Sequence, residues 1–92
     1  MKLLWTPEGW DDYVSCHPNE PELINKINTL IKDIRRNPFT GLGKPEPLRG
    51  NYQGWWSRRI SSEHRLVYRI VGKDTDKHIE IAQCRYHYAK KD

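Results

Sequence analysis

The sequence predicts an α+β fold in the order β-α-α-β-β-β, with a two-helix hairpin packed on one face of an antiparallel sheet. Three observations support this prediction. A short apolar segment opens the chain, a stripe of leucine and isoleucine with helical spacing follows, and three strand-like segments with turn signals occupy the second half. The length of 92 residues fits a single domain over 1–92 with one modest core.

The first strand is expected at Lys2–Trp5, and a helix start follows it directly. Thr6 is a favourable N-cap residue, and Pro7 suits the first helical position because its fixed φ is already helical. This helix is expected to end near His17, because Pro18 disfavours helical geometry in the residue before it.

The second helix is expected to begin within residues 19–22 and to end at Asn37 and Pro38. Its apolar residues form the strongest periodic signal in the chain; they are Leu23, Ile24, Ile27, Leu30, Ile31 and Ile34. This stripe would either pack on the sheet or bind a partner helix, and packing on the sheet is the favoured interpretation. Trp5 and Trp10 are expected to line the same helix–sheet core.

Residues 38–54 are rich in glycine and proline and predict a long loop. Loops of this length are either disordered or functional. Three strands are expected after it, at Trp55–Ile60, His64–Val71 and His78–His87. Short turns separate them, so they are expected to form an antiparallel meander.

The composition argues against several classes of protein. No apolar run approaches the roughly 18 residues that a membrane span requires, and the apolar start is too short for a signal peptide, so we expect a cytoplasmic protein. Cys16 and Cys84 are too few for a disulfide scaffold, and no Cys/His pair has zinc-finger spacing. We therefore expect neither a metal site nor a cofactor.

Charge is distributed unevenly along the chain. Residues 1–34 carry three basic and six acidic side chains, a net −3, whereas residues 35–92 carry thirteen and six, a net +7. Strand alternation places Arg65 and Arg69 on the face opposite the apolar side chains. Such a basic face would either bind an RNA backbone, by releasing counterions from phosphates, or be an ordinary solvated surface.

The tripeptide Pro45-Glu46-Pro47 is unusual. Both prolines have a fixed φ, and Pro47 also pushes Glu46 towards extended geometry. The Glu46 carboxylate therefore sits on a stiff backbone, and little entropy is lost in positioning it. This residue is either a catalytic carboxylate or a surface glutamate in a turn.

The segment Tyr86-His87-Tyr88 is a second candidate for chemistry, because histidine exchanges protons near neutral pH. A histidine in this position would otherwise be structural or simply exposed. Trp55 and Trp56 are adjacent in a strand and face opposite ways, so one is expected to be buried while the other is free to stack on a base.

Taken together, long segments of the chain resemble the YoeB family within the RelE/ParE toxin superfamily. The resemblance is carried by Met1–Trp5, Trp10–Tyr13, Lys26–Asn28, Leu30–Asp33, Arg35–Phe39, Gly41–Leu48, Trp56–Ile60, Glu63–Tyr68 and Cys84–Tyr88, in family order over nearly the whole chain. It implies the RelE-like microbial RNase fold. It also implies a toxin that cuts mRNA in the ribosomal A site without a metal, leaving a 2′,3′-cyclic phosphate and a 5′-hydroxyl.

The same resemblance implies roles for individual residues. Glu46 would be the general base, His87 the general acid, and Arg65 the group that stabilises charge on the phosphate. Tyr88 would help to orient the substrate or the acid. The expected RNA- and phosphate-binding residues are Lys44, Arg49, Arg58 and Arg59.

The implied partners are the 70S ribosome with mRNA in its A site and an antitoxin of the YefM/Phd type. Operator DNA would be bound only by the toxin–antitoxin complex, and a homodimer is an option. The sequence departs from the family pattern at Arg49, where lysine is more usual, in the long turn at 72–77, and in the extension 89–92 beyond Tyr88.

Two other functions fit the same fold. A ParE-like gyrase poison would share the helices and the sheet but would not need Glu46, Arg65 and His87, so their presence argues against it. A non-catalytic RNA- or ribosome-binding module would bind without cleaving, and its binding would survive loss of Glu46 or His87.

Overall fold

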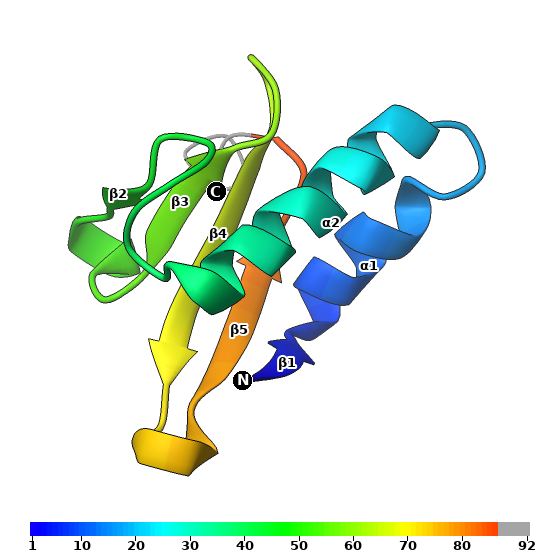
Figure 1. Cartoon of the computed structure of the whole chain (residues 1–92). Helices are drawn as coiled ribbons and strands as arrows, with labels where there is room; N and C mark the ends of the chain where they lie inside the picture. Colours follow the sequence, from blue (N-terminus) through cyan, green and yellow to red (C-terminus); the bar gives the residue numbers. More distant parts are fainter. Residues whose placement is uncertain (87–92) are drawn as a thin grey trace.

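The structure is a computed structural model that describes residues 1–86, with two helices in one layer and a sheet in the other (Figure 1). In chain order its elements are β1 (Lys2–Trp5), α1 (Pro7–Ser15), α2 (Pro21–Arg36), β2 (Glu46–Pro47), the 3-10 turn η1 (Gly50–Tyr52), β3 (Trp56–Arg59), β4 (Arg65–Val71), the 3-10 turn η2 (Asp74–Asp76) and β5 (His78–Gln83). The predicted α+β class and element order are confirmed, with β2 and the two 3-10 turns as short additions.

The sheet is mixed, whereas the sequence predicted a wholly antiparallel one. Its strands lie in the order β1-β5-β4-β3-β2, and the pairs from β2 to β5 are antiparallel as expected. Strand β1 instead runs parallel to β5, with Leu3 opposite Ile79 and Trp5 opposite Ile81. A parallel pair needs a long crossover connection, and the helices and the meander between β1 and β5 provide it.

Helix α1 is docked tightly on β5. Thr6 Oγ1 accepts the Gly9 N–H at 3.1 Å, while the Thr6 N–H donates to the Ile81 carbonyl at 3.0 Å. Gly9 lies against the same carbonyl, because a Cβ there would be 2.5 Å from its oxygen. The helix ends at Ser15, two residues before His17, where the sequence predicted its end.

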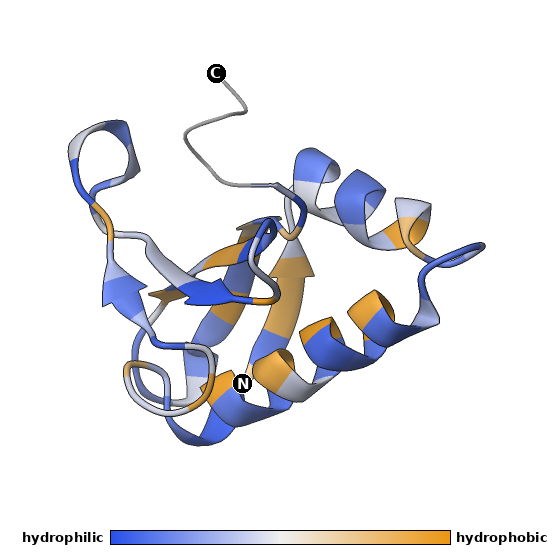
Figure 2. Ribbon diagram, turned by 90° about the horizontal axis from the view of Figure 1, so that it is seen from above, coloured by the Kyte–Doolittle hydropathy of each residue, from blue (hydrophilic) through white to orange (hydrophobic). Residues whose placement is uncertain are grey.

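The isoleucine stripe of α2 forms the core, and Figure 2 shows the apolar face of this helix turned towards the sheet. The buried residues are Ile24, Ile27, Leu30, Ile31 and Ile34 of α2 and Leu66, Tyr68, Ile79 and Ile81 of the sheet. Trp5 packs against this core, but Trp10 is 50% exposed, so its predicted place in the core is wrong. Trp10 contacts the outer side of Trp5, with ring centroids 5.9 Å apart.

Arg58 is fully buried and holds the loop that follows α2. Its Nη1 donates to Asp33 Oδ2 at 2.6 Å and to the Leu42 carbonyl at 3.1 Å, and its Nη2 donates to the Thr40 carbonyl at 2.9 Å. Its Nε donates to the Tyr68 hydroxyl at 3.1 Å. The guanidinium is not accessible to a phosphate, so the prediction that Arg58 binds RNA is wrong; strand alternation turns it towards the helices.

The same network orders the segment 38–54, which the sequence predicted as a loop. The Tyr68 hydroxyl donates to the Pro38 carbonyl at 2.6 Å, and the Leu42 N–H donates to Asp33 Oδ2 at 2.9 Å. The Leu42 N–H and the Arg58 guanidinium together hold the pKa of the Asp33 carboxyl below its usual range. Beyond this anchor the chain forms β2 at the edge of the sheet.

Cys16 and Cys84 are both buried, and the Cys16 sulfur accepts a hydrogen bond from Arg85 Nη1 at 3.3 Å. Within residues 1–86, neither helix has the length and apolar character needed to cross a lipid bilayer.

Candidate active site

The strand register decides which side chains share the sheet face that the helices leave open. Across four strands, Glu46 of β2 lies opposite Ser57 of β3, Ser57 opposite Val67 of β4, and Val67 opposite Gln83 of β5. Strand side chains alternate between faces, and the residues flanking Val67 pack beneath the helices. Glu46 is the exposed end of this row, whereas Ser57, Val67 and Gln83 are buried.

The next row on this face consists of two arginines. Arg59 of β3 lies directly opposite Arg65 of β4 in the antiparallel register. Like charges in this position destabilise a sheet, so the pair carries a small cost that a bound anion would remove. The arrangement therefore favours binding of a phosphate or another polyanion.

Arg65 is held by the turn that precedes its strand. Its Nη1 donates to the Ser61 carbonyl at 2.8 Å and to the His64 carbonyl at 3.1 Å. Among the described residues no hydrogen bond engages its Nε or Nη2, and the side chain is half-exposed. A guanidinium anchored at one nitrogen has its other N–H groups available to a phosphate oxygen.

Glu46 and Arg65 lie on either side of β3. Neighbouring strands are about 4.8 Å apart, so β2 and β4 are separated by roughly 10 Å. This spacing leaves room for a ribose-phosphate unit between the carboxylate and the guanidinium. Gly43 precedes β2 and fixes the chain beside β3. Its carbonyl accepts the Arg59 N–H at 2.6 Å, and its φ is +77°.

A groove of about 710 Å³ lies beside the arginine row, between α2 and the turn that joins β3 to β4. Its basic lining residues come from separate parts of the chain; they are Lys26, Lys44, Arg59 and Arg65. Thr29, Ser61 and Ser62 add hydroxyl groups, and none of the residues that line the groove is acidic. Its chemistry therefore suits a polyanion better than an apolar ligand.

Tyr86 brings the C-terminal segment to the edge of the arginine row. Strand β5 ends at Gln83, so within the described chain it is shorter than the predicted strand to His87. Tyr86 has φ +59°, and its carbonyl accepts the Arg65 N–H at 3.1 Å. The two predicted catalytic residues that follow, His87 and Tyr88, lie outside the described residues.

The remaining predicted binding residues lie near the edge of the sheet. Arg49 is exposed and immediately precedes η1. Trp55 is partly covered, because the Arg69 guanidinium lies 4.4 Å from its ring centroid. Trp56 packs against the core and Phe39, so it also has little free surface for a nucleobase.

Two residues that the sequence did not mark as functional organise this end of the site. The buried His64 accepts the Tyr86 N–H through Nδ1 at 2.7 Å. Arg85 Nη1 forms an ion pair with Glu20 Oε1 at 2.6 Å, and this contact raises the pKa of the guanidinium above its ordinary value. Both contacts span long sequence separations, so no local signal could have revealed them.

Comparison with known proteins gives a consistent result. A family model described as the YoeB-like toxin of bacterial type II toxin–antitoxin systems matches residues 5–88. Toxin YoeB of Escherichia coli strain K12 is 56% identical over 88 residues, which cover 96% of this chain and 100% of the relative.

Solved structures agree with this match. A YoeB/ParE toxin from Agrobacterium tumefaciens has 51% identity and a TM-score of 0.91, covering 96% of this chain and 100% of that one. YoeB of Staphylococcus aureus, 44% identical, has been solved as a dimer (TM-score 0.82) and in a heterotetrameric complex with YefM (TM-score 0.83). Each of these covers 96% of this chain and 98% of the matched one.

Proposed function

The chain belongs to the YoeB-like toxin family of bacterial type II toxin–antitoxin systems, and we propose that it is a ribosome-dependent endoribonuclease. It would cut mRNA in the ribosomal A site and so inhibit translation. The observation that best supports this proposal is the open sheet face, where the exposed Glu46 and the paired Arg59 and Arg65 lie on neighbouring rows.

The proposed reaction is an acid–base attack within the RNA. The Glu46 carboxylate accepts the proton of a ribose 2′-hydroxyl, and the oxygen attacks the adjacent phosphorus. The bond to the 5′-oxygen breaks, and His87 donates a proton to that leaving group. The products are a 2′,3′-cyclic phosphate and a 5′-hydroxyl, and each proton transfer contributes roughly 10²–10⁴-fold to the rate.

Arg65 would stabilise the negative charge that develops on the phosphate in the transition state. Its Nη1 is anchored to backbone carbonyls of the 61–64 turn, so the side chain is oriented before the substrate binds. A guanidinium supplies this charge without deprotonating. Tyr88 would orient the substrate or the acid.

Binding of the RNA would depend on the basic residues around this centre. Arg59 is exposed beside Arg65, Lys44 shares the groove with both, and Arg49 lies beyond β2. Charge-assisted contacts to phosphates are independent of base identity, so they would place the strand rather than read its sequence. Arg58 is excluded from this set because its guanidinium is buried in the loop anchor.

The proposed partners follow from the family and from the chemistry of the site. They are the 70S ribosome with its mRNA, and a YefM/Phd-type antitoxin, since YoeB of Staphylococcus aureus is in complex with YefM. Operator DNA would be bound by the toxin–antitoxin complex. A homodimer is proposed because the same Staphylococcus aureus protein has been solved as a dimer, and the site of action would be the cytoplasm.

The test is primer extension on a defined mRNA in a reconstituted translation system, with and without ribosomes. The proteins compared are wild type, Glu46→Gln, Arg65→Ala and His87→Ala, with Arg35→Ala on the exposed side of α2 as a matched control. We expect cleavage in the A site that requires ribosomes, falls by about 10²-fold or more in the three site variants, and is unchanged in the control.

Intact mRNA with saturating wild-type protein would overturn the proposal. Ribosome binding without cleavage would then identify a binding module, and DNA cleavage in cells with intact mRNA would identify a gyrase poison.

A further inference from the structure

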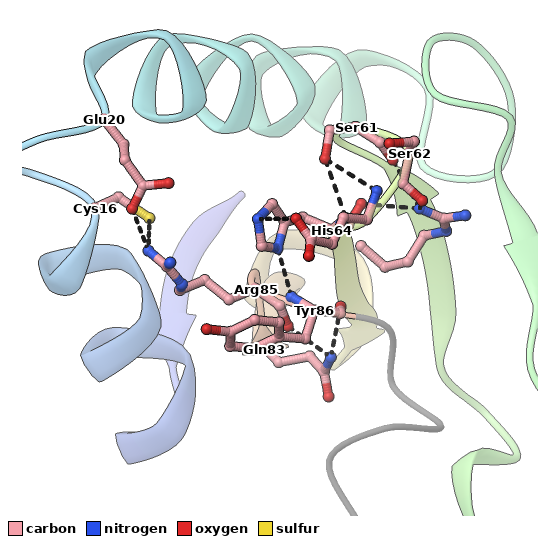
Figure 3. A network of polar contacts seen from close by, with 10 residues as sticks. Cys16, Glu20, Ser61, Ser62, His64, Gln83, Arg85 and Tyr86 are labelled. Atoms are coloured by element: carbon pink, nitrogen blue, oxygen red, sulfur yellow. Dashed lines mark hydrogen bonds and ion pairs between the residues drawn. The ribbon is translucent and has the colours of Figure 1, made fainter.

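The backbone of Tyr86 is held on both sides, by the side chain of His64 and by the backbone of Arg65, and Figure 3 shows its contact with His64. Its N–H donates to His64 Nδ1 at 2.7 Å, and its carbonyl accepts the Arg65 N–H at 3.1 Å. Gln83 Nε2 donates to the carbonyls of Arg85 and Tyr86 at 3.2 and 3.3 Å. The C-terminal segment is thus fixed at the residue before His87.

Tyr86 needs such support because its backbone is strained. Its φ of +59° lies in the left-handed region, which residues with a Cβ rarely adopt. A strained residue of this kind persists only where its surroundings hold it in place. Here the hydrogen bond that Tyr86 N–H donates to the His64 side chain supports it, as does the edge-on contact of the two rings, with centroids 5.3 Å apart.

We propose that His64 is a positioning residue for catalysis: through Nδ1 it holds the backbone of Tyr86, the residue before the proposed acid His87, beside Arg65. This inference rests on the proposed function, in which His87 is the general acid. His64 itself would contact neither the RNA nor the reacting atoms.

The geometry also defines the state of the imidazole. A backbone N–H can only donate, so Nδ1 must be the unprotonated nitrogen and the proton must be on Nε2. Glu63 Oε1 lies 3.6 Å from Nε2, where it favours that proton position. The backbone of His64 is itself held by the preceding turn, because the His64 N–H donates to Ser61 Oγ at 3.1 Å and the His64 carbonyl accepts the Ile60 N–H at 3.0 Å.

A second anchor ties the preceding residues to the helices. Arg85 pairs with Glu20 at 2.6 Å, and the Cys84 N–H donates to Asp12 Oδ2 at 3.1 Å. These contacts fix the chain up to Arg85. The position of the next residue, Tyr86, then depends on its contact with His64. Loss of the imidazole should therefore release the backbone of Tyr86 without detaching residues 84 and 85 from the helices.

The experiment compares His64→Leu, which keeps an apolar side chain without an acceptor, with His64→Asn, whose Oδ1 can replace Nδ1 as the acceptor. His78→Leu is the matched control, because His78 is a half-buried histidine that begins β5, at the opposite end of the sheet from Tyr86. Single-turnover cleavage of ribosome-bound mRNA is measured over a range of ribosome concentrations, and exchange of the Tyr86 amide hydrogen is followed by NMR.

For His64→Leu we expect the cleavage rate at saturating ribosomes to fall about 100-fold, as for a misplaced catalytic group, with the half-saturating concentration unchanged. The Tyr86 amide should exchange about tenfold faster, which corresponds to one lost hydrogen bond. His64→Asn should recover most of both properties, and His78→Leu should match the wild type. A merely structural role for His64 would lower the unfolding midpoint without this selective loss of rate and its rescue by asparagine.

Wild-type cleavage by His64→Leu, or unchanged exchange of its Tyr86 amide, would overturn the proposal. If the Leu variant fails to fold, the Asn variant and the wild type still decide: a nitrogen–nitrogen scalar coupling through the hydrogen bond between Tyr86 and His64 supports the contact, and its absence refutes it. If the wild type cleaves no RNA, the proposed function fails on its own, while the coupling and the exchange rates still test the docking of Tyr86.

Discussion

Arg58 and Arg59 are adjacent in β3 and carry the same charge, yet the structure places them in opposite environments. Arg58 points under the helices and donates to Asp33 and to loop carbonyls, whereas Arg59 is exposed on the open face opposite Arg65. Strand alternation is the physical cause of this difference. One arginine therefore contributes to folding, and its neighbour is exposed to solvent.

Substitution of Arg58 should lower the stability of the fold, whereas substitution of Arg59 should weaken ribosome binding. Arg58→Met would leave Asp33 and the loop carbonyls without their buried partner, so we expect a loss of about 3 kcal/mol in the free energy of unfolding, measured by urea denaturation. Arg59→Met should leave the unfolding free energy within about 0.5 kcal/mol of wild type but weaken ribosome binding. Equal unfolding curves for the two variants would contradict the assignment of Arg58 as the loop anchor.

At the scale of elements, α2 and the segment after it act together to present Glu46. The helix ends at Arg36, and the buried contacts of Asp33 and Tyr68 then secure the chain before it reaches β2. Pro45 and Pro47, whose φ angles are fixed, stiffen the backbone on either side of Glu46. The carboxylate is thereby carried on a short strand whose approach is fixed by the core.

This anchor should be sensitive to acid. The folded-state pKa of Asp33 is lowered, so its stabilising contribution is complete above the unfolded-state pKa of about 3.9 and is lost as the pH falls through the folded-state value. We expect Asp33→Asn to be less stable than wild type at neutral pH, with the difference in urea midpoint shrinking below about pH 3.9. A difference that stays constant down to acid would show that the carboxylate does not stabilise the loop as an ion.

At the scale of the whole molecule, the helices and the basic surface residues lie on different sides of the sheet. The helices cover one face of the sheet, while the basic groove and the arginine row occupy the open face and its rim. The acidic side chains of the first half include Asp33, Glu20 and Asp12, which form internal contacts with Arg58, Arg85 and Cys84. The basic side chains that line the groove are not part of these contacts.

The groove can be tested with two lysines of the same helix. Lys26 lines the groove and Lys32 does not, although both are exposed on α2. Lys26→Gln should weaken ribosome binding and reduce the slope of log K against log salt by about 1, because one fewer phosphate contact releases one fewer counterion. Lys32→Gln should retain the wild-type slope, and equal slopes for both variants would argue against RNA in the groove.

Local patterns predicted most of the secondary structure correctly. The isoleucine stripe, the Thr6-Pro7 start and the turn residues depend on neighbours within a few positions, so the order of helices and strands and the core face of α2 could be read directly. The family resemblance added the site residues, and the register places Glu46, Arg59 and Arg65 on one face. The roles of Glu46, Arg65, His87 and Tyr88 all stay predictions.

Other features depend on residues that are far apart in the chain. The parallel pairing of β1 with β5, the burial of Arg58 against Asp33 and the docking of Tyr86 on His64 join positions 22 to 76 residues apart. Contacts over such separations produce no periodic pattern in the sequence, because the partners meet only when the sheet packs under the helices. Local residue types thus specified the elements, whereas packing decided whether each charged side chain supports the core or is exposed on the surface.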